Sequence, residues 1–573
     1  MTVNAASALR RRTVSFDAQY TVYLVVLGIV ALFVLYPVLV ILVDSFVAGP
    51  IGTPRHWSLD GWRAAFSDPT MLNAVANTAK VLVANESISL PSAVLIAWLL
   101  ARSDLPLRGT LEFAFWVTFF LPSLSVTLGW IVLLDPQNGL LNQLATALPF
   151  VTKPPFNIYS FWGIVWAHIS SSSLAIKVML LTPLFRNLDG TFEEAARCSG
   201  AGRWQTLSRI VIPAVAPGIL TVLVLSLIRA MQTFEIEMVL GPPFNFWVFG
   251  TKIYTFVAQV PPEFASATAL AVIGFAIITP LIFLHRWLAT RTDYTAITGR
   301  ERTQPMPLGR WRWPIFAAVA LLAVTITVLP VVFLVTASFM KLFGFFNIAA
   351  PWTDAHWHAV FSDDFFLRAL ANTLELASGT ALGSIVLSSL AAYFAVRSRY
   401  RGRGTLDFLS WLPFAIPGIL LGVGLLYVFL GNPLLRMLYG SIALMILAMV
   451  IAGMTLGTQI LKTAILQLGA ALEEAARASG ASWWYGFRHV IVPILMPTLV
   501  LVGVINFIAA SRDIASIALL ASNSSKTVSL LQLDYMVDGR WEDAAVVSVV
   551  VILVTTGAAF LARLFGLRLA MRG

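Results

Sequence analysis

Seven ionisable residues of this chain stand inside or at the ends of strongly apolar segments, where charge is costly and usually serves a function. They are Glu86, His168, Arg229, Glu235, Glu237, Arg512 and Asp513. Carboxylates and imidazole can ligate a hard cation, and a mixture of acids and arginines can equally line a path for an organic anion. The pattern predicts a polar vestibule for a charged cargo, with Glu235 and Asp513 facing its central axis and Glu86 deeper.

Several of these residues also have a structural explanation. Arg229, like Lys177, lies near the end of an apolar segment, from which a long side chain can extend to water. His168 can be a packed, hydrogen-bonded histidine. His356 and His358 form an H-x-H pair with no third ligand at a fixed spacing, so a metal site there has weak support and the metal ligands stay unassigned.

The sequence offers no arrangement for catalysis. No serine–histidine, paired-aspartate or H-E-x-x-H pattern falls in the apolar segments, which argues against an intramembrane enzyme. The G-x-x-x-x-G-K-[ST] loop that binds ATP phosphates is missing. The single cysteine, Cys198, excludes an intrachain disulfide. We therefore expect a chain that is not an enzyme and binds no cofactor.

The elements that position these residues must lie in lipid. Of the 573 residues, 58% are hydrophobic and 12% are charged, about half the charged share of a soluble domain. About twelve apolar segments are long enough for a crossing, which takes roughly 20 residues. They run near 22–43, 81–101, 113–134, 161–184, 210–231, 264–284, 314–335, 374–396, 406–430, 442–461, 490–508 and 544–564. We expect an all-α polytopic membrane protein.

The placement of Lys and Arg predicts the orientation. If the N-terminus is cytoplasmic, 25 of the 38 Lys and Arg residues fall in cytoplasmic segments and 10 in outer loops. Positive residues hold their loops in the cytoplasm during insertion, so this distribution favours cytoplasmic N- and C-termini. It also explains the net charge of +10 without nucleic acid.

An internal repeat runs through most of the chain. "WRAAFSD" at Trp62 returns as "WHAVFSD" at Trp357, and "ARSDLPLRGTLEF" at Ala101 returns as "VRSRYRGRGTLDF" at Val396, both 295 positions later. Six crossings per repeat is an even number, so the two halves are parallel, and a substrate path can lie between them. The predicted division is a first half at 1–290, a linker at 291–313 and a second half at 314–573.

Two polar, glycine-broken stretches interrupt the apolar sequence at equivalent places. "EEAARCSGAGRWQTLSRIVIP" begins at Glu193, and "EEAARASGASWWYGFRHVIVP" begins 280 positions later at Glu473. The "EEAAR" residues favour helix, and Gly200 and Gly480 permit a sharp turn. One such stretch is usually an ordinary amphipathic connector, but a matched pair indicates a shared task.

Both stretches resemble the EAA loop of binding-protein-dependent ABC importer permeases, with valine or isoleucine where leucine is usual before the proline. The resemblance implies a type I ABC importer permease fold, in which each loop docks in an ATP-hydrolysing subunit and passes its closure to the membrane helices. The loop residues it assigns to ATPase coupling are Glu193, Glu194, Ala195, Ala196 and Gly200 in the first copy, and Glu473, Glu474, Ala475, Ala476 and Gly480 in the second.

The same resemblance implies the partners and the cargo. Two ATP-binding-cassette subunits on the cytoplasmic side would carry the ATP and Mg, a substrate-binding protein would dock outside, and the chain would lie in a bacterial inner membrane. The fused arrangement is similar to the ferric-iron uptake permeases, and fused permeases for thiamine, phosphonates or sugar phosphates share it. A secondary transporter driven by an ion gradient would explain the repeat but not the two loops.

The charge distribution makes the topology testable. In a Cys198→Ser background, a cysteine at Gly200 or Gly480 should react only with a thiol reagent that reaches the cytoplasm, and one in "WRAAFSD" or "WHAVFSD" only from outside. Labelling of Gly200→Cys from outside intact cells would contradict the predicted orientation and the coupling argument with it.

Overall fold

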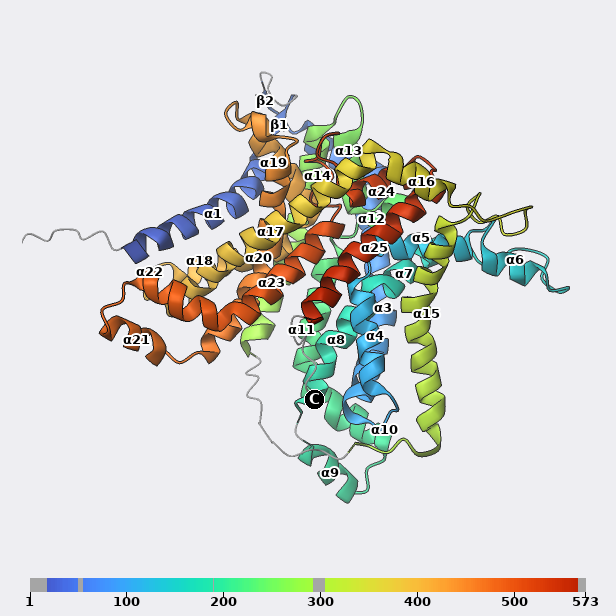
Figure 1. Cartoon of the computed structure of the whole chain (residues 1–573), viewed down its shortest axis with the longest axis horizontal. Coiled ribbons are helices and arrows are strands. Elements are labelled where there is room, and N and C mark those ends of the chain that lie inside the picture. Colours follow the sequence, from blue (N-terminus) through green and yellow to red (C-terminus); the bar gives the residue numbers. More distant parts are fainter. Residues whose placement is uncertain (1–17, 50–54, 189, 292–304, 565–573) are drawn as a thin grey trace, which may run out of the picture.

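The computed structural model describes residues 18–49, 55–188, 190–291 and 305–564 and is almost entirely helical (Figure 1). Ten helical segments of this part are long and apolar enough to cross a membrane. They are α1 (Ala18–Asp44), α3 (Pro69–Arg102), α7 with α8 (Phe161–His168 and Leu174–Arg186), α11 (Ile212–Ala230), α14 (Phe264–Arg291), α15 (Arg312–Ser338), α17 (Asp364–Arg397), α20 (Ile442–Gln467), α23 (Val492–Arg512) and α25 (Trp541–Leu564).

The third and ninth predicted crossings are broken rather than continuous. The third consists of α4 (Arg108–Phe120) and α5 (Ser123–Leu134), bent by 101°, and the ninth of α18 (Arg403–Trp411) with a 3₁₀ turn (Leu412–Ala415) and α19 (Gly418–Gly431), bent by 110°. Each second helix begins directly after a proline, Pro122 or Pro417. Proline cannot donate the next helical hydrogen bond, so the helix stops there. With each bent pair counted as one span, the described residues reach the expected twelve.

Shorter elements connect the crossings. They are α2 (Asp60–Ser67), α6 (Leu140–Thr146), α9 (Thr191–Cys198), α10 (Arg203–Thr206), α12 (Glu235–Leu240), α13 (Phe249–Ala258), α16 (Ala355–Ser362), α21 (Ala471–Ala478), α22 (Trp483–Gly486), α24 (Val528–Val537), π-helical turns at Ile169–Ser173, Leu207–Val211 and Phe487–Ile491, 3₁₀ turns at Pro242–Phe244, Gly309–Trp311 and Arg436–Leu438, and the strands β1 (Val47–Ala48) and β2 (His56–Trp57). The two strands pair antiparallel.

The repeat is visible residue for residue in the helix bounds. Helices α3 and α17 have the same length and lie 295 positions apart, as do the short helices α2 and α16. Helices α9 and α10 match α21 and α22 at an offset of 280, and the following π-helical turns match as well. The insertion that changes the offset lies between residues 135 and 160 and includes α6, which projects from the bundle in Figure 1.

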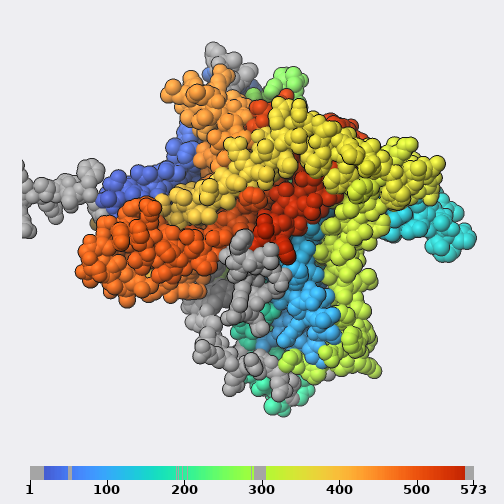
Figure 2. Space-filling model, viewed as in Figure 1, coloured from blue at the N-terminus to red at the C-terminus, as the bar shows by residue number. Residues whose placement is uncertain are grey.

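The first helix of each half packs against the other half. Helix α1 contacts α17, α18 and α19, and its Tyr23 hydroxyl donates to Arg401 O at 2.9 Å. Helix α15 contacts α4 and α5, and a Cβ on Gly129 would lie only 2.2 Å from Pro330 O, so glycine is required for this approach. Figure 1 shows α1 beside the second half, and Figure 2 shows the yellow-green residues of α15 against the blue residues of the first half. The exchange of α1 and α15 interlocks the halves.

Repeated Asn-Thr pairs in α3 and α17 hold the starts of the short helices α13 and α24 beside these crossings. Thr78 Oγ1 accepts from Phe249 N, and Thr373 Oγ1 accepts from Val528 N, each at 2.8 Å. These hydroxyls satisfy the free N–H groups at the start of α13 and α24. The neighbouring asparagines, Asn77 and Asn372, donate to backbone carbonyls just before those starts.

The connection between the halves is fixed to the end of α3. Met306 N donates to Arg102 O at 2.8 Å, Asp104 N donates to Met306 O at 3.1 Å, and Leu308 N donates to an Asp104 carboxylate oxygen at 2.8 Å. Met306 and Leu308 are buried. The described end of the linker is therefore anchored to the turn from which Arg102 projects.

Candidate functional site

The two polar stretches form matching helix–turn–helix loops that project from the bundle. Gly200 and Gly480 have φ values of +79° and +82°, which L side chains rarely adopt, so the predicted sharp turns are confirmed. A π-helical turn then joins each loop to the next crossing, α11 or α23. Helix α9 lies at the lower end of the first half in Figure 1, and α21 at the far left end of the second half.

Adjacent glutamates in each loop point in different directions. Glu193 is 5% exposed and its carboxylate lies 3.4 Å from Arg102 Nε, whereas Glu194 is exposed. Glu473 lies 3.0 Å from Arg397 Nε, and Glu474 is exposed. Among the other predicted coupling residues, Ala195, Ala475, Gly200 and Gly480 are exposed, Ala196 is buried and Ala476 is intermediate. The exposed face of each loop thus presents the second glutamate of its pair.

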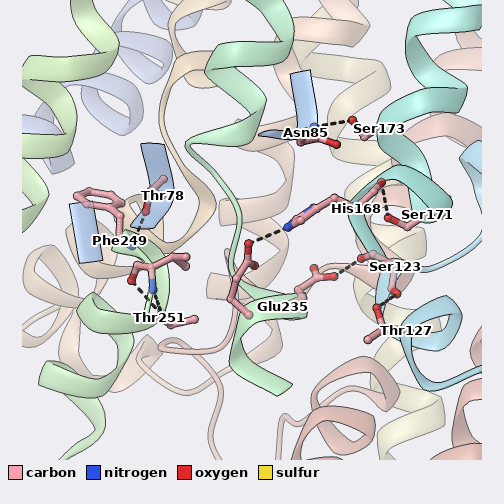
Figure 3. A network of polar contacts seen from close by, with 12 residues as sticks. Thr78, Asn85, Ser123, Thr127, His168, Ser171, Ser173, Glu235, Phe249 and Thr251 are labelled. Carbon is pink, nitrogen blue, oxygen red and sulfur yellow. Dashed lines mark hydrogen bonds and ion pairs between the residues drawn. The ribbon is translucent and has the colours of Figure 1, made fainter. Parts of the chain in front are cut away.

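Charged groups from both halves meet near the broken crossings. The Ser123 hydroxyl, at the start of α5, donates to Glu235, and these side chains point toward each other in Figure 3. Asp513 accepts from Ser516 N at 2.8 Å and from the Ser516 hydroxyl at 3.2 Å. The charge of Glu235 interacts with those of Asp513 and Arg512. The predicted cluster is therefore a mixed acid–arginine network, and its orientation toward the central axis stays a prediction.

Polar side chains cap the two breaks reciprocally. Arg512 Nη1 donates to Phe119 O at 2.9 Å and to Leu121 O at 3.0 Å, at the break in the third crossing. Gln232 Nε2 donates to Phe414 O at 2.8 Å, at the break in the ninth. Gln232 and Arg512 are equivalent at the 280 offset, and Phe119 and Phe414 at the 295 offset. Each half thus satisfies carbonyls that the bend in the other half exposes.

Arginine side chains also stack over the two equivalent rings. The Arg512 guanidinium carbon lies 5.7 Å from the Phe119 ring centre, and that of Arg229 lies 5.4 Å from the Phe414 ring centre. Arg229 is exposed on the protein surface. Arg229 and Arg512 each stand at the end of a crossing in one half, α11 or α23. Each lies against the broken crossing of the other half.

The other residues of the predicted set, Glu86, His168 and Glu237, are paired inside the first half. His168 Nε2 lies 2.7 Å from Glu237, and a dashed line leaves the His168 ring in Figure 3. Lys177 Nζ lies 2.9 Å from Glu86, and the lysine side chain is 1% exposed. Extension of Lys177 to the interface is therefore wrong, because its ammonium is buried and also donates to the Ser89 and Ser173 hydroxyls. Glu86 belongs to this pair between α3 and α8.

The H-x-H pair is divided between two carboxylates. His356 Nδ1 lies 3.0 Å from Asp543, whereas the exposed His358 lies 3.4 Å from Asp354. The described residues contain no group of three or more His, Cys, Asp or Glu that could hold a metal ion. The two histidines thus have different partners and do not form a common site.

Sequence reasoning missed Arg102, Arg397 and Gln232. The arginines were visible as a repeated Arg-Ser pair after the second and eighth crossings, but their glutamate partners repeat at a different offset, which hid the pairing. Gln232 gave no signal, because its equivalent is an arginine. Only the folded chain shows that the two residue types serve one capping position.

Comparison with known proteins identifies a family and several similar proteins. Residues 93–294 and 384–571 match the family described as binding-protein-dependent transport system inner membrane component. A Sinorhizobium fredii protein named a probable ABC transporter permease is 28% identical over 78% of this chain and 79% of its own length. A ferric transport system permease protein of Actinobacillus pleuropneumoniae is 25% identical over 69% of this chain, which spans only 57% of that relative. A solved bacterial ABC transporter for alginate import is 18% identical, with a TM-score of 0.40, over 48% of this chain and 96% of its own.

The reciprocal caps predict a specific stability order. Arg512→Met should lower the thermal unfolding temperature of the purified protein, because it leaves Phe119 O and Leu121 O without a donor, and each unsatisfied buried acceptor costs about 1–3 kcal/mol. Arg512→Gln should lower the unfolding temperature less, because the chain itself has glutamine at the equivalent position 232. The exposed Arg436→Met is the control and should melt like the parent. Scanning fluorimetry measures the order, and equal melting of Arg512→Met and the parent would contradict it.

Proposed function

The chain belongs to the binding-protein-dependent transport system inner membrane components, and on that premise we propose that it forms the translocation path of an ATP-driven ferric-iron importer. Membership makes it the permease component of an ABC transporter, a multi-pass protein of the inner membrane without enzymatic activity of its own. In this family ATP is bound by separate ATPase subunits. The coupling residues, the cargo and the orientation are the proposed part.

The matched loops carry the coupling part of the proposal. Each projects from the bundle, turns at a glycine with positive φ, and presents an exposed glutamate, Glu194 or Glu474. Each is also continuous with a membrane crossing through a π-helical turn. Two such loops suit two ATPase subunits, whose closure would move the loops and hence α11 and α23.

The outer side of the proposed importer receives cargo from a substrate-binding protein. The family is binding-protein-dependent, and the longest described segment on this side, residues 231–263, contains only the short helices α12 and α13 and a 3₁₀ turn. The termini and both loops would lie in the cytoplasm, as the distribution of Lys and Arg favours.

Ferric iron is the cargo that two observations support. The aligned relative from Actinobacillus pleuropneumoniae is named a ferric transport permease. Glu235 and Asp513 bring carboxylates from both halves into one charged cluster, and carboxylate oxygen suits a hard cation. The positive charge of neighbouring Arg512 offsets part of the negative charge of the carboxylates, so the cluster would bind the iron weakly. Weak binding suits transport, because the cargo must also leave.

Blocking the glycine turns tests the coupling. Gly200→Val with Gly480→Val should abolish ATP-driven transport or ATPase association, because backbone strain at positive φ costs about 1–3 kcal/mol per site and displaces the loop helix. The control is Gly109→Val with Gly404→Val, an equivalent pair with ordinary φ and open space around each Cβ. Full transport by the Gly200/Gly480 variant would count against the proposed coupling.

Neutralising the acids tests the cargo. Glu235→Gln and Asp513→Asn should each reduce uptake of radiolabelled ferric iron at least about tenfold, the equivalent of about 1.4 kcal/mol, while the exposed Glu263→Gln control retains it. Glu86→Gln should mainly reduce stability, because it leaves Lys177 buried without its counter-charge. Each variant is checked for expression and ATPase assembly. Uptake like the parent by both Glu235→Gln and Asp513→Asn would reject the acidic path, and transport of an organic phosphate but not iron by the parent would reject iron.

A further inference from the structure

The first glutamate of each loop is held by the arginine that ends the second crossing of its half. Arg102 is the last residue of α3, and Arg397 is the last residue of α17. Their Nε atoms lie 3.4 Å from Glu193 and 3.0 Å from Glu473, respectively. The Arg102 and Glu193 side chains are 4% and 6% exposed, and those of Arg397 and Glu473 are 17% and 11% exposed. The same largely dry ion pair therefore occurs twice.

Each arginine also donates hydrogen bonds to backbone carbonyls just before its loop. Arg102 Nη2 donates to Leu188 O, near the end of the fourth crossing. Arg397 Nη2 donates to Leu468 O at 2.5 Å and to Ile465 O at 3.1 Å, at the end of the tenth. One planar guanidinium thus joins three elements, and its fixed fork of donors holds them in a defined geometry.

The loop is connected to the membrane helices both along the chain and by side chains. The covalent connection runs through the π-helical turn to α11 or α23. The ion pair connects the loop to α3 or α17, which are far away in sequence. In the second half α17 contacts the loop in other ways too: the Tyr393 hydroxyl donates to Glu473 at 3.0 Å, and the Phe394 ring stacks on Trp483. The ion pair of the first glutamate is the part of this link that occurs in both halves.

We propose that Glu193 and Glu473 are positioning residues that transmit loop movement to α3 and α17, while Glu194 and Glu474 face the ATPase subunits. Successive residues of a helix point about 100° apart, so one glutamate can face inward while its neighbour faces outward. The inference rests on the proposed docking of the loops. It divides the repeated Glu-Glu pair into an internal link and an external contact.

The test compares movement at the loops with movement at the far ends of α3 and α17. In a Cys198→Ser background, one spin-label pair is placed at Ser199→Cys and Ser479→Cys, which are exposed equivalent positions after α9 and α21. A second pair is placed at Leu72→Cys and Leu367→Cys, which are exposed and equivalent near the starts of α3 and α17. Distances are measured in the complete complex with its ATPase subunits, without nucleotide and after trapping with ATP and vanadate.

In the parent, both label pairs should change distance on trapping. In Glu193→Ala with Glu473→Ala, the ATPase subunits should remain bound and the loop pair should still move, but the change at Leu72 and Leu367 should fall to less than half. In the matched control, Glu194→Ala with Glu474→Ala, fewer complexes should retain ATPase subunits, and those that do should show the full change. Glu193→Gln with Glu473→Gln keeps an acceptor for each arginine and should give an intermediate loss.

The outcomes separate the inference from its premise. A full distance change at Leu72 and Leu367 in the Glu193/Glu473 alanine variant overturns the transmission role. Loss of ATPase subunits from the well-folded glutamine variant overturns it as well, because these glutamates would then be ATPase contacts. Absence of any nucleotide-dependent movement at Ser199 and Ser479 in the parent instead rejects the docking of the loops on which the inference rests.

Discussion

Backbone carbonyls inside a membrane need hydrogen-bond donors from protein, and this requirement organises the centre of the molecule. The prolines at 122 and 417 bend two crossings by 101° and 110°, which exposes carbonyls that no helix can satisfy. Arg512 and Gln232 supply the donors from opposite halves. The bends are consequently stable only when the halves are together, and the helix ends that carry Glu235 and Asp513 are brought to the same place.

The frame is symmetric, but its charges are not. The two capping positions hold an arginine and a glutamine, so the centre carries different charge on its two sides. The Glu86–Lys177 pair has Ala381 and Gly457 at the corresponding positions of the second half, where small residues allow close packing instead. The two halves therefore present unlike charges and unlike packing on one repeated scaffold.

The sequence predicted features that depend on local composition or on repetition. Apolar length located the crossings, and the glycines at 200 and 480 located the turns, because both signals lie within a few residues. The bends at Pro122 and Pro417 were not predicted, because hydropathy is averaged over a window and is insensitive to the loss of one backbone N–H donor. The opposite directions of Glu193 and Glu194 were also out of reach. Their difference comes from Arg102, a distant residue whose side chain meets only one of them.

The exchange of α1 and α15 has a consequence for biosynthesis. Helix α1 enters the bilayer early, yet its packing surface on α18 and α19 is made of residues 403–431, which do not yet exist. At about 5–20 residues per second, the ribosome needs tens of seconds to reach them. During that interval α1 can pack against α14 of its own half but not against α18 and α19, and Gly424, which lies close to Pro37, has not been translated. Separate expression of the halves would leave each first helix without its packing partners in the other half, so assembly of the complete permease must follow translation of both.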